Sequence, residues 1–267
     1  MILTSLFVFI LGLSVGSFLN VVYFRLPRKK HFFLSRSYCP SCGKELKGFE
    51  LIPLLSFIIQ RGRCRTCQKP ISFIYPLVEG TTGLLFLFAY LGRDNLLSYA
   101  LSDLLMFFLI LAIVAVLFLI LLYDAKHMII PDEFIVIGLL LSLTNSLIVI
   151  VTNSSQTTLY QTIFLPIVTG FLVSIFFFSV ILITRGRGMG FGDVKLGFWL
   201  GILVPYPNIF LLLFLAFLSG ALVSLFLIFR SQKKLKDSIA FGPFLVFGTY
   251  LSLFWGNEII SFYLSLH

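Results

Sequence analysis

The chain of 267 residues contains eleven acidic residues, and two of them stand where long apolar runs meet polar segments. Asp124 ends one apolar run, and Asp193 opens another directly after the glycine-rich segment 188–192. An ionisable side chain next to lipid is costly, which makes both residues functional candidates. Two carboxyl groups that approach closely can share one proton and act together as acid and base. Asp124 and Asp193 are therefore candidates for a catalytic pair that needs neither metal nor cofactor.

The acidic residues also have plain structural explanations. Asp124 can form an ion pair with Lys126 or His127 at a wet boundary. Asp132 and Glu133 open the next apolar run, where an acidic side chain in the first turn of a helix interacts favourably with the helix dipole. We therefore expect Asp132 and Glu133 to stabilise a helix start, and both interpretations of Asp124 stay open at this point.

Four cysteines form two close pairs, Cys39 with Cys42 and Cys64 with Cys67. Two such pairs separated by 21 residues are typical of four thiolates around a tetrahedral zinc ion. Two disulfides are the alternative, but disulfides rarely persist in the reducing cytoplasm, where the charge pattern described below places this segment. Because all four ligands come from the protein, the zinc has no open position, and we expect its role to be structural.

The composition places the chain in a membrane. Hydrophobic residues make up 59% of the sequence and charged residues only 12%, which is too little polar surface to cover a soluble globule of this size. Apolar runs long enough to cross a bilayer recur along almost the whole length. We predict an all-α membrane protein with about eight transmembrane helices, near residues 2–24, 72–91, 100–123, 133–151, 161–183, 192–205, 208–229 and 240–263.

The positive charge is explained by membrane orientation. Alternate threading of these helices puts 18 of the 20 Lys and Arg residues on one side, which is then the cytoplasmic side. The net charge of +9 therefore needs no nucleic-acid partner, and the basic face suits anionic lipid headgroups. We expect three parts: a first transmembrane helix at 1–24, a cytoplasmic zinc-binding subdomain at 25–71, and a multi-span membrane domain at 72–267.

Taken together, these residues resemble the type IV prepilin peptidase family, whose members are bifunctional leader peptidases and N-methyltransferases. The similarity runs nearly end to end, and the glycine-aspartate segment is its most specific part. It includes Gly16-Ser17-Phe18-Leu19-Asn20-Val21-Val22 with Arg25-Leu26-Pro27, both cysteine pairs, Tyr75-Pro76-Leu77-Val78-Glu79, Asp124 followed by Pro131-Asp132, Gly188-Met189-Gly190-Phe191-Gly192-Asp193-Val194-Lys195-Leu196, and Phe241-Gly242-Pro243-Phe244.

The resemblance implies that Asp124 and Asp193 are the catalytic pair of an aspartyl peptidase, with Asp132 secondary. Its substrates would be prepilins or pseudopilins, cut at the cytoplasmic face of the bacterial inner membrane just ahead of a hydrophobic helix. The family also uses S-adenosylmethionine to methylate the new N-terminal residue. Glu79 is a weak candidate for binding the substrate or the methyl donor; its alternative is a hydrogen bond to a neighbouring span.

Two other functions are compatible with parts of the sequence. A proton-coupled transporter also uses acidic residues in the membrane, but these acids cluster at one face and not at the midplane. A non-catalytic assembly factor could dock a cytoplasmic partner through the zinc loop, although it would leave the glycine-aspartate segment without a purpose. Hydrolysis of a pilin precursor separates the peptidase from both.

Overall fold

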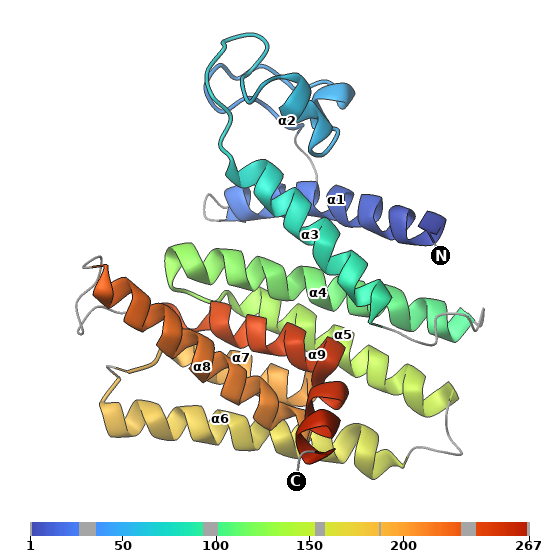
Figure 1. Ribbon diagram of the computed structural model, residues 1–267, viewed down its shortest axis with the longest axis vertical. Helices are drawn as coiled ribbons and strands as arrows, with labels where there is room; N and C mark the ends of the chain where they lie inside the picture. The colour runs from blue at the N-terminus through green and yellow to red at the C-terminus, as the bar shows by residue number, and fades with distance from the viewer. Residues whose placement is uncertain are drawn as a thin grey trace. The chain divides into compact units, whose positions relative to one another are not determined.

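The computed structural model describes residues 2–26, 36–92, 101–152, 158–186, 188–230 and 239–265, and in these ranges the chain is helical apart from short turns and two isolated β-bridges (Figure 1). The prediction of an all-α protein is confirmed. The elements are α1 (Ile2–Arg25), the 3₁₀ turn η2 (Gly48–Leu51), α2 (Leu55–Ile59), α3 (Ile74–Leu91), α4 (Leu101–His127), α5 (Asp132–Thr152), the π-helical turn η3 (Tyr160–Phe164), α6 (Leu165–Thr184), α7 (Phe191–Leu203), α8 (Asn208–Phe229) and α9 (Gly242–Ser265).

Six helical stretches in the described ranges are long and apolar enough to cross a membrane: α1, α3, α4, α5, η3 with α6, and α8. Each corresponds to one of the eight predicted spans. The short helix α7 has only 13 residues, or about 20 Å of helix, which is less than the roughly 30 Å of a hydrocarbon core. The helix α9 also lies outside the six. The prediction of eight spans is therefore confirmed only for six of them.

The chain divides into two compact units, Met1–Asp94 and Asn95–His267. In the first unit, α1 and α3 pack with their backbones close together. A Cβ atom on Gly12 would lie 2.8 Å from the Cα of Gly83, and one on Gly16 would lie 2.8 Å from the Cα of Glu79. Only glycine permits this approach, because any side chain would overlap the opposite helix.

The second unit is built around α4 and α7, which carry its most deeply buried side chains. The helix α7 packs against α5 and α6, and α9 packs against α4 and α8. Trp199 of α7 is fully buried, and its indole N–H donates to the hydroxyl of Ser142 in α5 at 2.9 Å. A Cβ atom on Gly138 would overlap the Trp199 ring. This contact fixes the position of α7 against α5.

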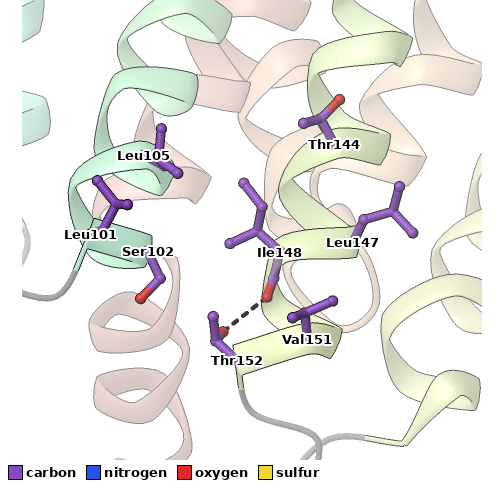
Figure 2. A pocket seen from close by; sticks show the side chains of 8 residues that line it. All are labelled: Leu101, Ser102, Leu105, Thr144, Leu147, Ile148, Val151 and Thr152. Carbon is purple, nitrogen blue, oxygen red and sulfur yellow. Dashed lines mark hydrogen bonds between the residues drawn. The ribbon is translucent and has the colours of Figure 1, made fainter.

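A cavity of about 340 Å³ lies between the start of α4 and the end of α5. Figure 2 shows that its lining is mostly aliphatic, and that the hydroxyl of Thr152 donates to the carbonyl of Ile148 and so offers little to a polar ligand. Asp124 lies 23 residues after Leu101 on α4, or about 34 Å along a helix. The cavity is therefore separate from the candidate catalytic residues. It is lined by Leu101, Ser102, Leu105, Thr144, Leu147, Ile148, Val151 and Thr152.

Candidate functional site

Asp124 lies in the last turn of α4, and its side chain is buried, with 4% of the residue exposed. The backbone N–H of Gly242, the first residue of α9, donates to Asp124 Oδ2 at 3.0 Å. A helix N-terminus carries partial positive charge and free N–H groups, so it stabilises a carboxylate at this position. A Cβ atom on Gly242 would lie 2.5 Å from Asp124 Oδ2. The site therefore requires glycine at position 242. The sequence had indicated Gly242 only as part of a motif and not as a partner of Asp124.

Asp193 lies in the first turn of α7 and is 8% exposed. The backbone N–H of Gly190 donates to Asp193 Oδ2 at 3.2 Å, and the N–H of Asp193 donates to the carbonyl of Gly190 at 3.1 Å. The next glycine, Gly192, faces Ile130, whose Cβ would be 3.3 Å from a Cβ at position 192. The glycine-rich segment therefore orients the carboxyl group of Asp193 and lets the start of α7 approach the turn between α4 and α5.

The two carboxyl groups lie close enough for Asp124 to act electrostatically on Asp193. Among the described residues, neither forms a salt bridge with Lys, Arg or His. The alternative, an ion pair of Asp124 with Lys126 or His127, is not among the salt bridges of the described residues. Two buried acidic groups, each oriented by a glycine N–H, can share a proton and activate water.

Asp132 begins α5, as predicted for a first-turn acid, and Glu133 follows it in the same turn. The structure adds a partner that the sequence did not indicate: Lys195 Nζ lies 2.7 Å from Asp132 Oδ1. Because Lys195 comes two residues after Asp193 in α7, this ion pair joins α7 to α5 beside the candidate catalytic pair. The Asp132 side chain is 68% exposed, so water screens the interaction and its contribution to stability is small.

Glu79 is buried in α3 of the first unit. Its Oε2 accepts a hydrogen bond from the backbone N–H of Leu54, the residue before α2, at 2.9 Å. This partner lies in the cysteine-containing segment between α1 and α3 and not in a neighbouring span, so both interpretations of Glu79 stay predictions. The neighbouring Asn20 donates to the carbonyl of Tyr75 at 3.1 Å, while its own buried Oδ1 has no hydrogen-bond partner.

The four cysteines converge in space, since their sulfur atoms all lie within 4.8 Å of one another. All four are free thiols, so the two-disulfide alternative does not describe this structure. The sulfur atoms of Cys39 and Cys67 are 3.9 Å apart, close to the separation of about 3.8 Å that a tetrahedral site with zinc–sulfur bonds of about 2.3 Å requires. The four cysteines thus form a possible metal-binding site whose donor set fits zinc.

Backbone hydrogen bonds prepare the thiols for a metal. In each pair, the residue after the second cysteine has a left-handed backbone and donates to the carbonyl of the first: Gly43 to Cys39 and Gln68 to Cys64, both at 2.9 Å. The N–H groups of Cys67 and Thr66 donate to the sulfur of Cys64 and lower its pKa to about 6. Cys64 is therefore the thiol that most readily gives the metal-binding thiolate, whereas burial and hydrogen bonds with the other three thiols raise the pKa of Cys42 to about 11.

Comparison with known proteins gives matches along most of the chain. Residues 10–92 match the family described as "Bacterial Peptidase A24 N-terminal domain", and residues 111–225 match the "Type IV leader peptidase family". The chain is 32% identical to the prepilin leader peptidase/N-methyltransferase of Bacillus subtilis, over 97% of both chains. It is 31% identical to that of Legionella pneumophila, over 95% of this chain and 92% of the relative. No solved structure matches.

A shorter match is closer in sequence. Over 91 residues, the chain is 56% identical to the prepilin leader peptidase/N-methyltransferase of Myxococcus xanthus. This match covers 34% of this chain and 27% of the relative.

Proposed function

This chain belongs to the type IV leader peptidase family, and from this premise we propose that it is an aspartyl endopeptidase that cleaves the leader peptides of type IV prepilins or pseudopilins. The names of its relatives support the substrate class. The observation that carries the catalytic assignment is the geometry of Asp124 and Asp193, two buried carboxyl groups within electrostatic range of each other. No other pair of acidic residues in the described part of the second unit is buried.

In the proposed reaction, one carboxylate of the pair accepts a proton from water as the water attacks the carbonyl carbon of the scissile bond. The protonated partner donates its proton to the carbonyl oxygen, which gives a tetrahedral intermediate. When the carbon–nitrogen bond breaks, the carboxyl group that took the proton from water donates it to the leaving amine, and the other carboxylate takes back the hydroxyl proton as the carbonyl re-forms. The backbone N–H groups of Gly242 and Gly190 hold one oxygen of Asp124 and of Asp193, respectively. The other oxygen of each carboxyl group then stays available for water and substrate.

We propose that cleavage occurs at the cytoplasmic face of the bacterial inner membrane. The excess of Lys and Arg in the segments next to Asp124 and Asp193 supports this orientation. The proposed organisation has three parts: a first transmembrane helix at 1–24, a cytoplasmic subdomain at 25–71 that binds one structural zinc ion, and the membrane peptidase domain at 72–267. A pilin leader that stays in the cytoplasm would present its cleavage site where the substrate helix enters the lipid.

The direct test uses the purified full-length chain and a purified pilin precursor. Wild-type protein should release the leader peptide, with the cut ahead of the hydrophobic helix, as identified by mass spectrometry. A transporter or an assembly factor does not hydrolyse the precursor, so the absence of cleavage under conditions in which the Bacillus subtilis relative is active would contradict the proposal.

We also propose that the chain methylates the new N-terminus. S-adenosylmethionine supplies an already activated methyl group for such a transfer. Two acceptors where α1 packs against α3 fit the ammonium group of this donor. Asn20 Oδ1 is buried and has no hydrogen-bond partner, and Glu79 adds a buried carboxylate. Both can accept hydrogen bonds from an ammonium group.

Methylation needs an unprotonated amine held in line with the methyl group, and the aspartate pair has no necessary part in it. Asp193→Asn supplied with a pre-cleaved pilin and S-adenosylmethionine should therefore still add one methyl group, as detected by mass spectrometry of the pilin N-terminus. Glu79→Gln should impair methylation more than cleavage. If Asp193→Asn abolishes methylation of the pre-cleaved pilin, the two activities share one site and this part of the proposal fails.

A further inference from the structure

The cysteine-containing subdomain exposes a large amount of apolar surface around α2. Seven large apolar side chains between residues 49 and 73 are each 40% to 68% exposed. Three of them, Leu55, Ile58 and Ile59, belong to α2. So many exposed large apolar side chains in one short polar segment indicate a partner. Together these side chains form the α2 surface: Phe49, Leu51, Ile52, Leu55, Ile58, Ile59 and Phe73.

A hydrogen bond fixes the position at which the start of α2 lies along the axis of α3. The backbone N–H of Leu54, the residue directly before α2, donates to Glu79 Oε2 at 2.9 Å. Leu54 Cδ2 also lies 3.9 Å from the position that a Cβ on Gly80 would occupy. Glu79 comes five residues after Ile74, where α3 begins, and therefore lies about 7.5 Å along this candidate span.

This level lies within the membrane and not above it. The 18 residues of α3 extend about 27 Å, close to the roughly 30 Å of the hydrocarbon layer. A point about 7.5 Å from the start of α3 is therefore inside the layer that α3 spans, in the half next to that start. Leu54, the residue before α2, accordingly lies beside the first turns of α3, and Figure 1 shows α2 in the lobe next to the start of α3. The exposed side chains Leu55, Ile58 and Ile59 then face the region that lipid occupies.

Basic side chains follow α2 directly. Arg61, Arg63, Arg65 and Lys69 are all exposed, and the guanidinium group of Arg65 lies 4.7 Å from the ring centre of Phe49. Long basic side chains can lie along apolar surface while their charges reach the lipid phosphates. Apolar residues with adjacent Lys and Arg are typical of segments that bind in the interface of anionic membranes.

We propose that the α2 surface is an interfacial anchor, which lies among the lipids of the cytoplasmic leaflet with Arg61 and Arg63 at the phosphates of anionic headgroups. The anchor holds the metal-binding subdomain down against the membrane. This proposal depends on α1 and α3 crossing the membrane, and it does not depend on the peptidase or methyltransferase activity.

The test places a tryptophan on the α2 surface of the full-length chain in lipid nanodiscs. Fluorescence of Ile58→Trp, after subtraction of the wild-type signal from Trp199 and Trp255, should be blue-shifted and quenched by phospholipids brominated on their acyl chains. The matched control, Ser41→Trp, is at an exposed polar position in the first cysteine pair and should be neither shifted nor quenched. Zinc content, measured for both variants, verifies that the subdomain is folded.

Two results would overturn the proposal. Emission of Ile58→Trp at the wavelength of a water-exposed indole, without quenching, would place the α2 surface in solvent. Blue-shifted emission without quenching by brominated lipid would mean that protein, such as the second unit of the same chain, covers this surface.

A second measurement tests the role of the arginines. The quenching of Ile58→Trp should be stronger in nanodiscs that contain phosphatidylglycerol than in pure phosphatidylcholine, and Arg61→Gln with Arg63→Gln should remove this difference. Equal quenching in both lipids, unchanged by the two substitutions, would overturn the assignment of these arginines to lipid phosphates.

Discussion

The cysteine cluster and the aspartate pair are built in opposite ways. Each cysteine pair closes within a few residues, because the N–H of Cys39 bonds the carbonyl of Lys44 and the N–H of Cys64 bonds that of Lys69. Asp124, in contrast, is oriented by Gly242, which lies 118 residues further along the chain. The first site depends on local folding, whereas the second depends on the packing of helices. Substitutions should therefore unfold the first site and change the chemistry of the second within an intact fold.

The largest expected effect is the loss of cleavage in Asp124→Asn and Asp193→Asn. An amide cannot exchange the proton that the mechanism requires, so each substitution should lower the rate of leader cleavage on the order of 10³-fold or more. The thermal unfolding temperature in detergent and the zinc content should stay close to wild type, because neither residue supports the first unit. Wild-type cleavage by either variant would contradict the assignment of the pair.

The cysteine ligands should show the opposite pattern. Cys39→Ser or Cys64→Ser removes one of four metal ligands, and since loss of a supporting residue alone typically costs about 10–100-fold in metal affinity, loss of a ligand should cost more than about 100-fold. Wild-type protein should contain about one zinc per chain by elemental analysis. In the variants, limited proteolysis should cut the segment between the two cysteine pairs faster.

Ser41→Ala, a change in the same cysteine pair that removes no ligand, is the control and should keep its zinc. Purified wild-type protein without any metal would contradict the proposed zinc site.

A moderate effect is expected for Gly242→Ala, which tests whether helix packing alone sets the geometry of the aspartate pair. The added methyl group would lie 2.5 Å from Asp124 Oδ2, so α9 or the carboxyl group must move, and misplacement of this size should lower the cleavage rate about 10- to 100-fold. Gly220→Ala is the matched control, because its nearest neighbour, a ring carbon of Phe244, would lie at an ordinary contact distance of 3.4 Å. Equal rates for the two variants would show that the Gly242 N–H does not orient Asp124.

The smallest effect is expected at the ion pair between Asp132 and Lys195. Both side chains are well exposed, so Asp132→Asn should lower the free energy of unfolding by about 1 kcal/mol or less and leave most of the cleavage activity. The loss should shrink further at high salt, because ions screen exposed charges. A loss of activity comparable to that of Asp193→Asn would instead make Asp132 a member of the catalytic group.

The sequence predicted the features that depend on near neighbours. The convergence of the four cysteines could be predicted from their spacing, because each pair closes locally and brings its own two sulfur atoms to the cluster. The apolar runs predicted α1, α3, α4, α5, α6 and α8 because burial in lipid makes long apolar segments helical. Asp124 and Asp193 were found because a charged residue at the end of an apolar run is costly.

What the sequence did not indicate depends on contacts between distant helices. Nothing near Trp199 predicts that it packs on Gly138 and bonds Ser142, because lipid-facing and buried positions are equally apolar in these helices and leave no periodic pattern. The charge of Lys195 was visible but not its partner Asp132. Gly242 belonged to a recognised motif, and only the packing of α9 against α4 explains why it must be glycine.

The close contact between α1 and α3 also has a mechanical consequence. At Gly12 and Gly16 there is no flexible side chain between the helices, so sliding or tilting of one meets the main chain of the other at once. We therefore expect the two helices to move together as one rigid unit. Because Glu79 of this helix pair accepts a hydrogen bond from the backbone of Leu54, we expect a tilt of the pair to move the start of α2, and with it the cysteine-containing subdomain.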